Sequence, residues 1–206
     1  MTESDDNSGR DAAVYLITGI QAAGKSTVAQ ALAERFDRSA HIRGDTYRRF
    51  VVRGSAPMSP DPSPEALAQL RLRHRLAAQT ADAYAAQGFT AVVQDVVLGE
   101  WLPYTIEQIH TRPLYVVVLA PHPAAVEQRE AARAKKAYGT FTVTDLNHAL
   151  HTETPHTGLW LDTANLTVNQ TVDEILTRAK PIPPANPQSP PQRHPRPPEP
   201  VRSSDR

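Results

Sequence analysis

The sequence has 206 residues, of which 40% are apolar, and this is enough to build one folded domain around a single core. Its 22 basic and 22 acidic residues cancel, so we expect no attraction of the whole molecule to nucleic acid or to an anionic membrane. The absence of cysteine excludes disulfides and thiolate metal sites, and it fits a cytoplasmic protein.

Apolar runs alternate with helix-like segments along the chain. We expect strands at residues 14–18, 39–43, 90–95, 114–119 and 160–161. We expect helices at residues 24–36, 45–52, 64–87, 103–110, 123–134, 143–151 and 171–179. Because the strands are continuously apolar, both faces of the sheet should be covered, which predicts a three-layer α/β fold with a parallel sheet. The strand at residues 114–119 is the most strand-like and should be central.

Both ends of the chain differ from the segment between them. Residues 1–11 are polar and acidic and show no apolar signal segment, so we expect a flexible N-terminus. Residues 180–206 are rich in proline and poor in apolar side chains, which predicts a disordered or polyproline II tail. Such a tail is either a solvated extension or a ligand for an SH3-type domain. The folded domain should therefore span residues 12–179.

The pattern G-x-x-x-x-G-K-[ST] occurs at residues 19–26, directly after a predicted strand and at the start of a helix. In this context main-chain N–H groups surround the β-phosphate of a nucleotide, the lysine reaches the β- and γ-phosphates, and the serine hydroxyl can bind Mg²⁺. The sequence therefore predicts a site for a nucleoside triphosphate and Mg²⁺ formed by Gly19, Gln21, Ala22, Ala23, Gly24, Lys25, Ser26 and Thr27.

Two carboxylates follow predicted strands and should lie at the same edge of the sheet. Asp45 comes after the second strand, where it could accept the proton of a hydroxyl that attacks the γ-phosphate. The alternative is that Asp45 only caps the helix that follows it. Asp95 ends the third strand, as a Walker B acid near Mg²⁺ would, although a polar residue at a strand end can also simply begin a loop.

Two pairs of arginines are candidates for binding anions. Arg129 and Arg133 lie one helical turn apart, and could neutralise charge on a transferred phosphoryl group from a closing lid. Their alternative is a solvated helix face. Arg48 and Arg49 follow Asp45 and could contact an anionic or polar acceptor, or could simply be surface residues.

The sequence resembles the small P-loop kinases, and among them the chloramphenicol-phosphotransferase-like branch. The resemblance rests on the loop at residues 19–26, on Gly44 and Asp45, on residues 92–95, on Arg129 and Arg133, and on residues 161–163. It implies ATP-dependent transfer to a hydroxyl, with Asp45 as the base, the two arginines in a lid, and the loop after Asp162 near the adenine. Residues 53–76 depart from that branch and should shape the acceptor pocket.

Competing functions make different demands on the sequence. A nucleotide switch of the GTPase type needs a DxxG loop and an N/T-K-x-D segment, but the glycine after Asp95 comes only at position 99, one residue too late, and the sequence contains no N/T-K-x-D segment. A remodelling ATPase that acts on nucleic acid is disfavoured by the neutral charge. We therefore expect a phosphotransferase for a hydroxylated small molecule, such as a metabolite, nucleoside, sugar or antibiotic, with a non-kinase P-loop ATPase or a nucleotide-binding regulator as the alternative.

Overall fold

The protein is built around one sheet of five parallel strands. The structure, a computed structural model, describes residues 12–131 and 141–183. The strands are β1 (Val14–Gly19), β2 (Ser39–Arg43), β3 (Thr90–Gln94), β4 (Leu114–Leu119) and β5 (Leu159–Leu161). Their order across the sheet is β2-β3-β1-β4-β5, and every pairing is parallel. Since β1 occupies the middle position, the prediction that residues 114–119 form the central strand is wrong by one place.

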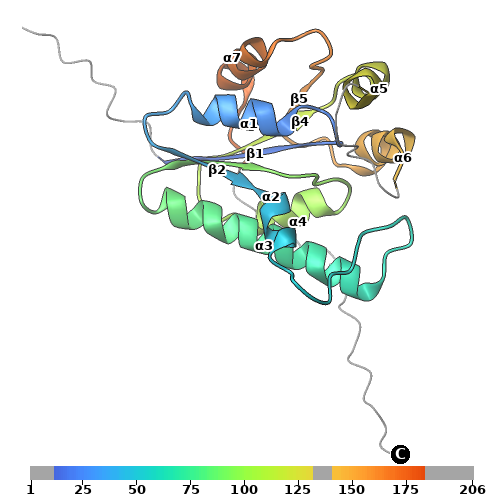
Figure 1. Ribbon diagram of the computed structural model, residues 1–206. Helices are drawn as coiled ribbons and strands as arrows, with labels where there is room; N and C mark the ends of the chain where they lie inside the picture. The colour runs from blue at the N-terminus through green and yellow to red at the C-terminus, as the bar shows by residue number, and fades with distance from the viewer. Residues whose placement is uncertain (1–11, 132–140, 184–206) are drawn as a thin grey trace, which may run out of the picture.

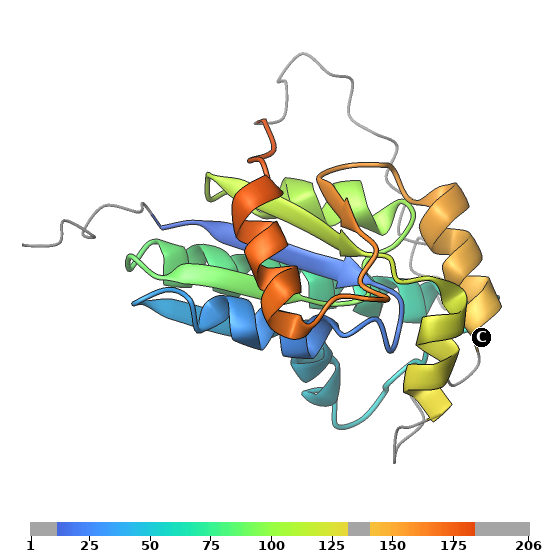
Figure 2. The same ribbon diagram turned by 90° about the horizontal axis from the view of Figure 1, so that it is seen from above.

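Helices cover both faces of the sheet, which confirms the predicted three-layer α/β fold (Figure 1). On one face lie α1 (Lys25–Ala33) and α7 (Val168–Arg178), and on the other lie α3 (Pro64–Ala85) and α4 (Trp101–Gln108). Seen from above, α5 (Pro123–Ala131) and α6 (Val143–His148) lie beyond the carboxyl ends of the strands (Figure 2). The short helix α2 (Gly44–Arg49) directly follows β2. The strands β1 and β4 are almost wholly buried, because apolar side chains on both of their faces meet helices.

Three helix boundaries differ from the sequence prediction for local reasons. Helix α7 begins three residues earlier than expected, at Val168, because Thr167 and Gln170 form a capping box. Helix α4 begins at Trp101, so Pro103 lies within its first turn. The N–H groups of a first turn have no partner within the helix, so the N–H that proline lacks costs no hydrogen bond there. Helix α6 ends at His148 and continues as one π-helical turn, η1 (Ala149–Glu153).

The folded part of the chain continues past residue 179. The short strand β5 pairs with residues 117–119 of β4, and the start of β4 is covered instead by the chain after α7. Pro181 bridges Tyr115, and the N–H of Ile182 donates to the carbonyl oxygen of Leu114 at 2.7 Å. The predicted proline-rich tail beyond residue 183, like the predicted flexible N-terminus, lies outside the described residues. Within the described residues, no helix has the length and hydrophobicity that would let it cross a membrane.

An ion pair fixes α3 to the end of β3. Arg73 donates from Nε to one carboxylate oxygen of Asp95 at 2.6 Å and from Nη2 to the other. The Asp95 side chain is 3% exposed and that of Arg73 is 16% exposed, so the pair is largely shielded from water. Gly44 packs against this carboxylate so closely that a Cβ at position 44 would lie 1.9 Å from Oδ2. The pair and the glycine together set how α2 and α3 approach the sheet edge.

Next to this ion pair, His74 is a buried and neutral part of the core. Its ring packs edge-on against Trp101, with the ring centroids 5.7 Å apart, and neither ring nitrogen has a hydrogen-bond partner among the described residues. Burial lowers the pKa of His74 from 6.5 to about 4, and the nearby charge of Arg73 acts in the same direction while Asp95 opposes both. The folded state therefore resists protonation of this ring.

Replacing either partner of the ion pair should destabilise the fold. We expect Arg73→Gln to lower the free energy of unfolding by about 3 kcal/mol, since it leaves the Asp95 carboxylate buried without a cation. Asp95→Asn should cost less, because Arg73 keeps some contact with water. Urea unfolding of both variants and of the double variant measures this, and the double variant should fall short of the sum by about 1–2 kcal/mol. Strictly additive losses would show that the pair makes no net contribution to α3 packing.

Acid should weaken the fold partly through His74. Because the unfolded chain binds a proton near pH 6.5 and the folded state does so only near pH 4, stability is lost as the pH falls through this interval. The full loss corresponds to about 3 kcal/mol. Unfolding measured from pH 7 to pH 4 should show a shallower decline for His74→Leu than for the wild type. Equal slopes would mean that the ring is protonated as easily in the fold as in the unfolded chain.

Candidate active site

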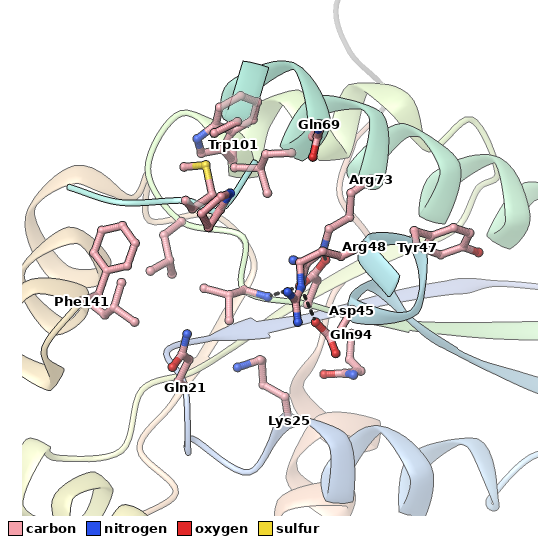
Figure 3. A pocket seen from close by; sticks show the side chains of 18 of the residues that line it. Gln21, Lys25, Asp45, Tyr47, Arg48, Gln69, Arg73, Gln94, Trp101 and Phe141 are labelled. Carbon is pink, nitrogen blue, oxygen red and sulfur yellow. Dashed lines mark hydrogen bonds and ion pairs between the residues drawn. The ribbon is translucent and has the colours of Figure 1, made fainter. Parts of the chain in front are cut away.

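A cleft of about 1470 Å³ opens where the carboxyl ends of β1, β2 and β3 meet, with walls from the loop after β1, α2, α3 and the residues after β3. It has a polar part and an apolar part (Figure 3). Lys25, Asp45, Arg48 and Arg73 gather in the polar part, and Trp101 lies at a distance from them. Other apolar lining residues are Met58, Leu98, Phe141, Leu146 and Ala149.

The loop between β1 and α1 has the backbone geometry of a phosphate site. Gly19 has a φ of 142°, and a Cβ at this position would lie 2.3 Å from the carbonyl oxygen of Leu119 on β4. Gly24 has a φ of 94° and precedes the first residue of α1. Ala22 also has a positive φ, of 61°, a conformation that is strained for a residue with a side chain and is common at ligand sites. The loop thus turns tightly over the sheet end.

The N-terminus of α1 points into the cleft without a side-chain cap. Its first N–H groups carry partial positive charge, which favours an anion at this position. Ser26 and Thr27 are exposed and line the cleft together with Gln21, Ala22, Gly24 and Lys25, whereas Gly19 and Ala23 of the predicted loop do not line it. Lys25 is 8% exposed, and its Nζ donates to the carbonyl oxygen of Ile20 at 2.7 Å. The ammonium group is therefore held against the loop that would surround a phosphate.

Asp45 lies in the same cleft and does not cap α2. The N-cap position of this helix is Arg43, and no side-chain cap is formed. Instead the Asp45 carboxylate accepts from Nε of Arg48 at 3.0 Å on one oxygen, and from Nε and Nη2 of Arg49 at 2.9 and 2.5 Å on the other. Burial would raise the pKa of Asp45, but the hydrogen bonds from the two arginines outweigh it and hold the pKa below its ordinary value.

Asp95 stands at the end of β3, as predicted, but its carboxylate already has partners. Both oxygens accept from Arg73, and one also accepts from the N–H of Val96 at 2.7 Å. No group of three or more acidic or histidine side chains among the described residues could hold a metal by itself. A Mg²⁺ site that relies on phosphates, waters and few protein oxygens fits these residues, because Mg²⁺ keeps several waters when it is bound. Ser26 and Asp95 remain the residues that would serve it.

The other predicted site residues are only partly brought together. Arg129 lines the cleft, and it donates from Nη2 to the carbonyl oxygen of Thr163 at 2.7 Å and from Nη1 to that of Ala23 at 3.5 Å. It thus ties α5 to the phosphate loop and to the segment after β5. Asp162 is exposed, accepts from the N–H of Ala164 at 2.9 Å, and does not line the cleft. Arg133 lies outside the described residues.

Sequence reasoning missed Arg73 and most of the apolar wall. Arg73 is one of three arginines within residues 71–75, and nothing in that run distinguishes the one that reaches Asp95. The apolar wall comes from segments far apart in sequence, such as residues 56–58, Trp101 and Phe141. The prediction that residues 53–76 shape the pocket agrees with the lining by residues 56–58 and by the first half of α3.

Known proteins share both sequence features and fold with this chain. The profile of the AAA domain family matches residues 14–153. No curated protein sequence matches the chain at a significant level. A sugar kinase from Janibacter sp. HTCC2649 superposes with a TM-score of 0.61 at 17% identity, over 82% of this chain and 94% of the other.

Two further solved structures have the same arrangement. The APS kinase of Mycobacterium tuberculosis, in complex with AMPPNP and APS, gives a TM-score of 0.60 at 17% identity over 82% of this chain and 98% of the other. The tunicamycin resistance protein of Deinococcus radiodurans gives 0.55 at 17% identity over 84% and 99%. Identities this low establish the fold alone. The chain belongs to the AAA domain family and has the α/β fold of the small P-loop kinases.

Proposed function

We propose that the protein is a kinase that transfers the γ-phosphoryl group of ATP to a hydroxyl group of a small molecule. The observation that carries this proposal is that the phosphate loop and the Asp45 carboxylate line one cleft. A carboxylate opposite the phosphate loop can receive the proton that an acceptor hydroxyl loses as it attacks. The chloramphenicol-phosphotransferase-like branch of these kinases remains a prediction from the sequence.

The size of the cleft also favours a reaction with two substrates. Sites for one small molecule are typically about 300–1,000 Å³, and this cleft, at about 1470 Å³, is larger. A nucleotide bound at the phosphate loop would leave the space between α2, α3 and Trp101 for an acceptor.

The phosphates would be bound mainly by the main chain. The N–H groups of the loop and of the first turn of α1 would surround the β-phosphate, and Lys25 would bridge the β- and γ-phosphates. The Ser26 hydroxyl and Asp95, directly or through water, would hold Mg²⁺, which would supply positive charge beside the phosphates. For Lys25 this requires exchange of the carbonyl oxygen of Ile20 for a phosphate oxygen.

The transfer step has a simple balance. The acceptor oxygen forms a bond to the γ-phosphorus while the bond from this phosphorus to the β–γ bridging oxygen breaks, and ADP leaves. The proton of the acceptor hydroxyl passes to Asp45. Arg129 would approach the γ-phosphate from the α5 side, with Arg133 as its companion in a lid, and the loop after Asp162 would lie near the adenine. Charge that spreads over the transferred group would be stabilised by the lysine and the arginines.

Removing the phosphate-loop lysine tests the kinase proposal. We expect Lys25→Ala to fold normally and to lose transfer by about 10²-fold or more, since one fixed positive charge is lost where the transition state carries negative charge. Lys180→Ala, an exposed lysine after α7, is the matched control and should behave as the wild type. The assay is a screen of hydroxylated metabolites for ATP-dependent mass gain of one phosphate. Undiminished turnover by Lys25→Ala would remove the kinase proposal.

The role of Asp45 is tested separately from nucleotide binding. Asp45→Asn should bind ATP as the wild type does and should lose about 10²- to 10⁴-fold in transfer rate, because an amide cannot accept the proton. Calorimetric titration with AMPPNP measures the first property, and the phosphorylation assay measures the second. The exposed Asp37→Asn is the control. An unchanged transfer rate would exclude Asp45 as the base, and ADP release without a phosphorylated acceptor would favour a non-kinase ATPase.

A further inference from the structure

Three arginines line the polar part of the cleft, and each is paired with a carboxylate. Arg73 holds Asp95, while Arg48 and Arg49 both hold Asp45. Two other cations line the cleft, but they bond to the main chain: Lys25 to the carbonyl of Ile20, and Arg129 to that of Thr163. The ion pairs at Asp45 and at Asp95 therefore differ in how easily they can separate.

The pairs at Asp45 are exposed and are formed within one helix. The side chains of Arg48 and Arg49 are 60% and 72% exposed and that of Asp45 is 38% exposed, at i,i+3 and i,i+4 spacing. Exposed pairs of this kind contribute little, typically below about 1 kcal/mol, so a competing anion can replace the carboxylate. The shielded pair of Arg73 and Asp95 lacks this freedom, because separating it would leave a buried charge.

These contacts work against Asp45 as a proton acceptor. Three N–H donors point at its two oxygens and occupy most of the acceptor sites of this carboxylate. The same hydrogen bonds hold the pKa of this carboxylate below its ordinary value. Asp45 would become a stronger base if its arginines moved away before transfer.

We propose that the acceptor carries an anionic group beside its reactive hydroxyl, and that this group takes Arg48 and Arg49 away from Asp45. Carboxylate, sulfate and phosphate all match the planar donor fork of a guanidinium group, and two forks can bind one anion. The inference rests on the proposed function for the role of Asp45. It adds the substrate class, because only an acceptor with an anionic group would release Asp45 from its two arginines.

The rest of the cleft agrees with this orientation of the acceptor. Its other acidic lining residues, Glu100 and Glu153, come from the segment before α4 and from η1, away from α2. The apolar wall with Trp101 and Phe141 contributes no cation to the lining of the cleft, since Arg71, which lies over the Trp101 ring, does not line it. The buried pair at Asp95 is already neutralised. An anionic group is therefore stabilised best at Arg48 and Arg49, which places its neighbouring hydroxyl close to Asp45.

The first test follows Asp45 directly and needs no turnover. The protein with ¹³C-labelled aspartate carboxyls, its phosphate loop filled with AMPPNP and Mg²⁺, is titrated by NMR in the presence and absence of inorganic sulfate. Sulfate should raise the pKa of Asp45 in the wild type. In the double variant Arg48→Gln/Arg49→Gln the pKa should already be raised and should not respond to sulfate. A sulfate response that is absent from the wild type, or equal in both proteins, would overturn the proposal.

The control for this test removes a matched ion pair elsewhere. Arg178 and Glu174 form an exposed i,i+4 pair on α7, with Arg178 56% exposed, outside the cleft. Arg178→Gln should leave the Asp45 titration and its sulfate response as in the wild type. If AMPPNP does not bind at all, the proposed function fails, whereas the sulfate titration of the free protein still decides the exchange at Asp45.

The second test compares acceptors in which a carboxylate replaces a hydroxymethyl group, such as gluconate with glucitol and glycerate with glycerol. The anionic member of a phosphorylated pair should have a kcat/KM at least about 10-fold higher, the discrimination that about 1.4 kcal/mol provides. In Arg48→Gln/Arg49→Gln this ratio should fall to about one, while Arg178→Gln keeps it. Preference for the neutral member, or a ratio that persists without the two arginines, would contradict an anionic acceptor.

Discussion

The close approach of Gly19 to the carbonyl of Leu119 is the contact on which the site depends. It lets the chain leave β1 and turn across the end of β4 without a side chain in the way. The turn then continues through Ala22 and Gly24, both with positive φ, into α1. The direction of α1 follows from this turn, and so does the direction of its unsatisfied N–H groups. A phosphate site formed by backbone groups is rigid because the sheet beneath it is rigid.

The second constraint is the crowding at the ends of β2 and β3. Gly44 has no side chain because the Asp95 carboxylate occupies the space in which a Cβ would lie. The Asp95 carboxylate accepts hydrogen bonds from Arg73, and this contact fixes the part of α3 that lines the cleft. Asp45, one residue after this glycine, is therefore delivered to the cleft by a packing arrangement and not by a flexible loop.

Much of the fold was predictable from local patterns. Apolar runs located the buried strands, and β4 was predicted with both of its bounds, because buried parallel strands have few other sequence explanations. The phosphate loop was predictable because its glycines and lysine have fixed spacing. The strand order was harder, since the most apolar strand, β4, lies beside the centre and not in it. The pattern of apolar residues indicates whether a strand is buried, but β1 and β4 are both buried, so the pattern does not show which of them is central.

The contacts between distant residues could not be read from the sequence. The pairing of Arg73 with Asp95 depends on which face of α3 meets the sheet, and three neighbouring arginines offered the same chemistry. The alternative that Asp45 caps α2 required knowing where the helix begins, and it begins one residue earlier, at Gly44. Likewise, the bond of Arg129 to Thr163 links segments that no spacing rule connects. Local sequence patterns predict helices and strands, whereas the site forms where several of these elements come into contact.

A crystal structure of the protein with AMPPNP and Mg²⁺ would show directly whether the triphosphate lies between the phosphate loop and Asp45. We expect the β-phosphate to accept hydrogen bonds from the main-chain N–H groups of residues 22–26. The γ-phosphate should lie on the side of the cleft that Asp45 faces. A nucleotide bound elsewhere, or a γ-phosphate separated from Asp45 by the body of the sheet, would contradict the account.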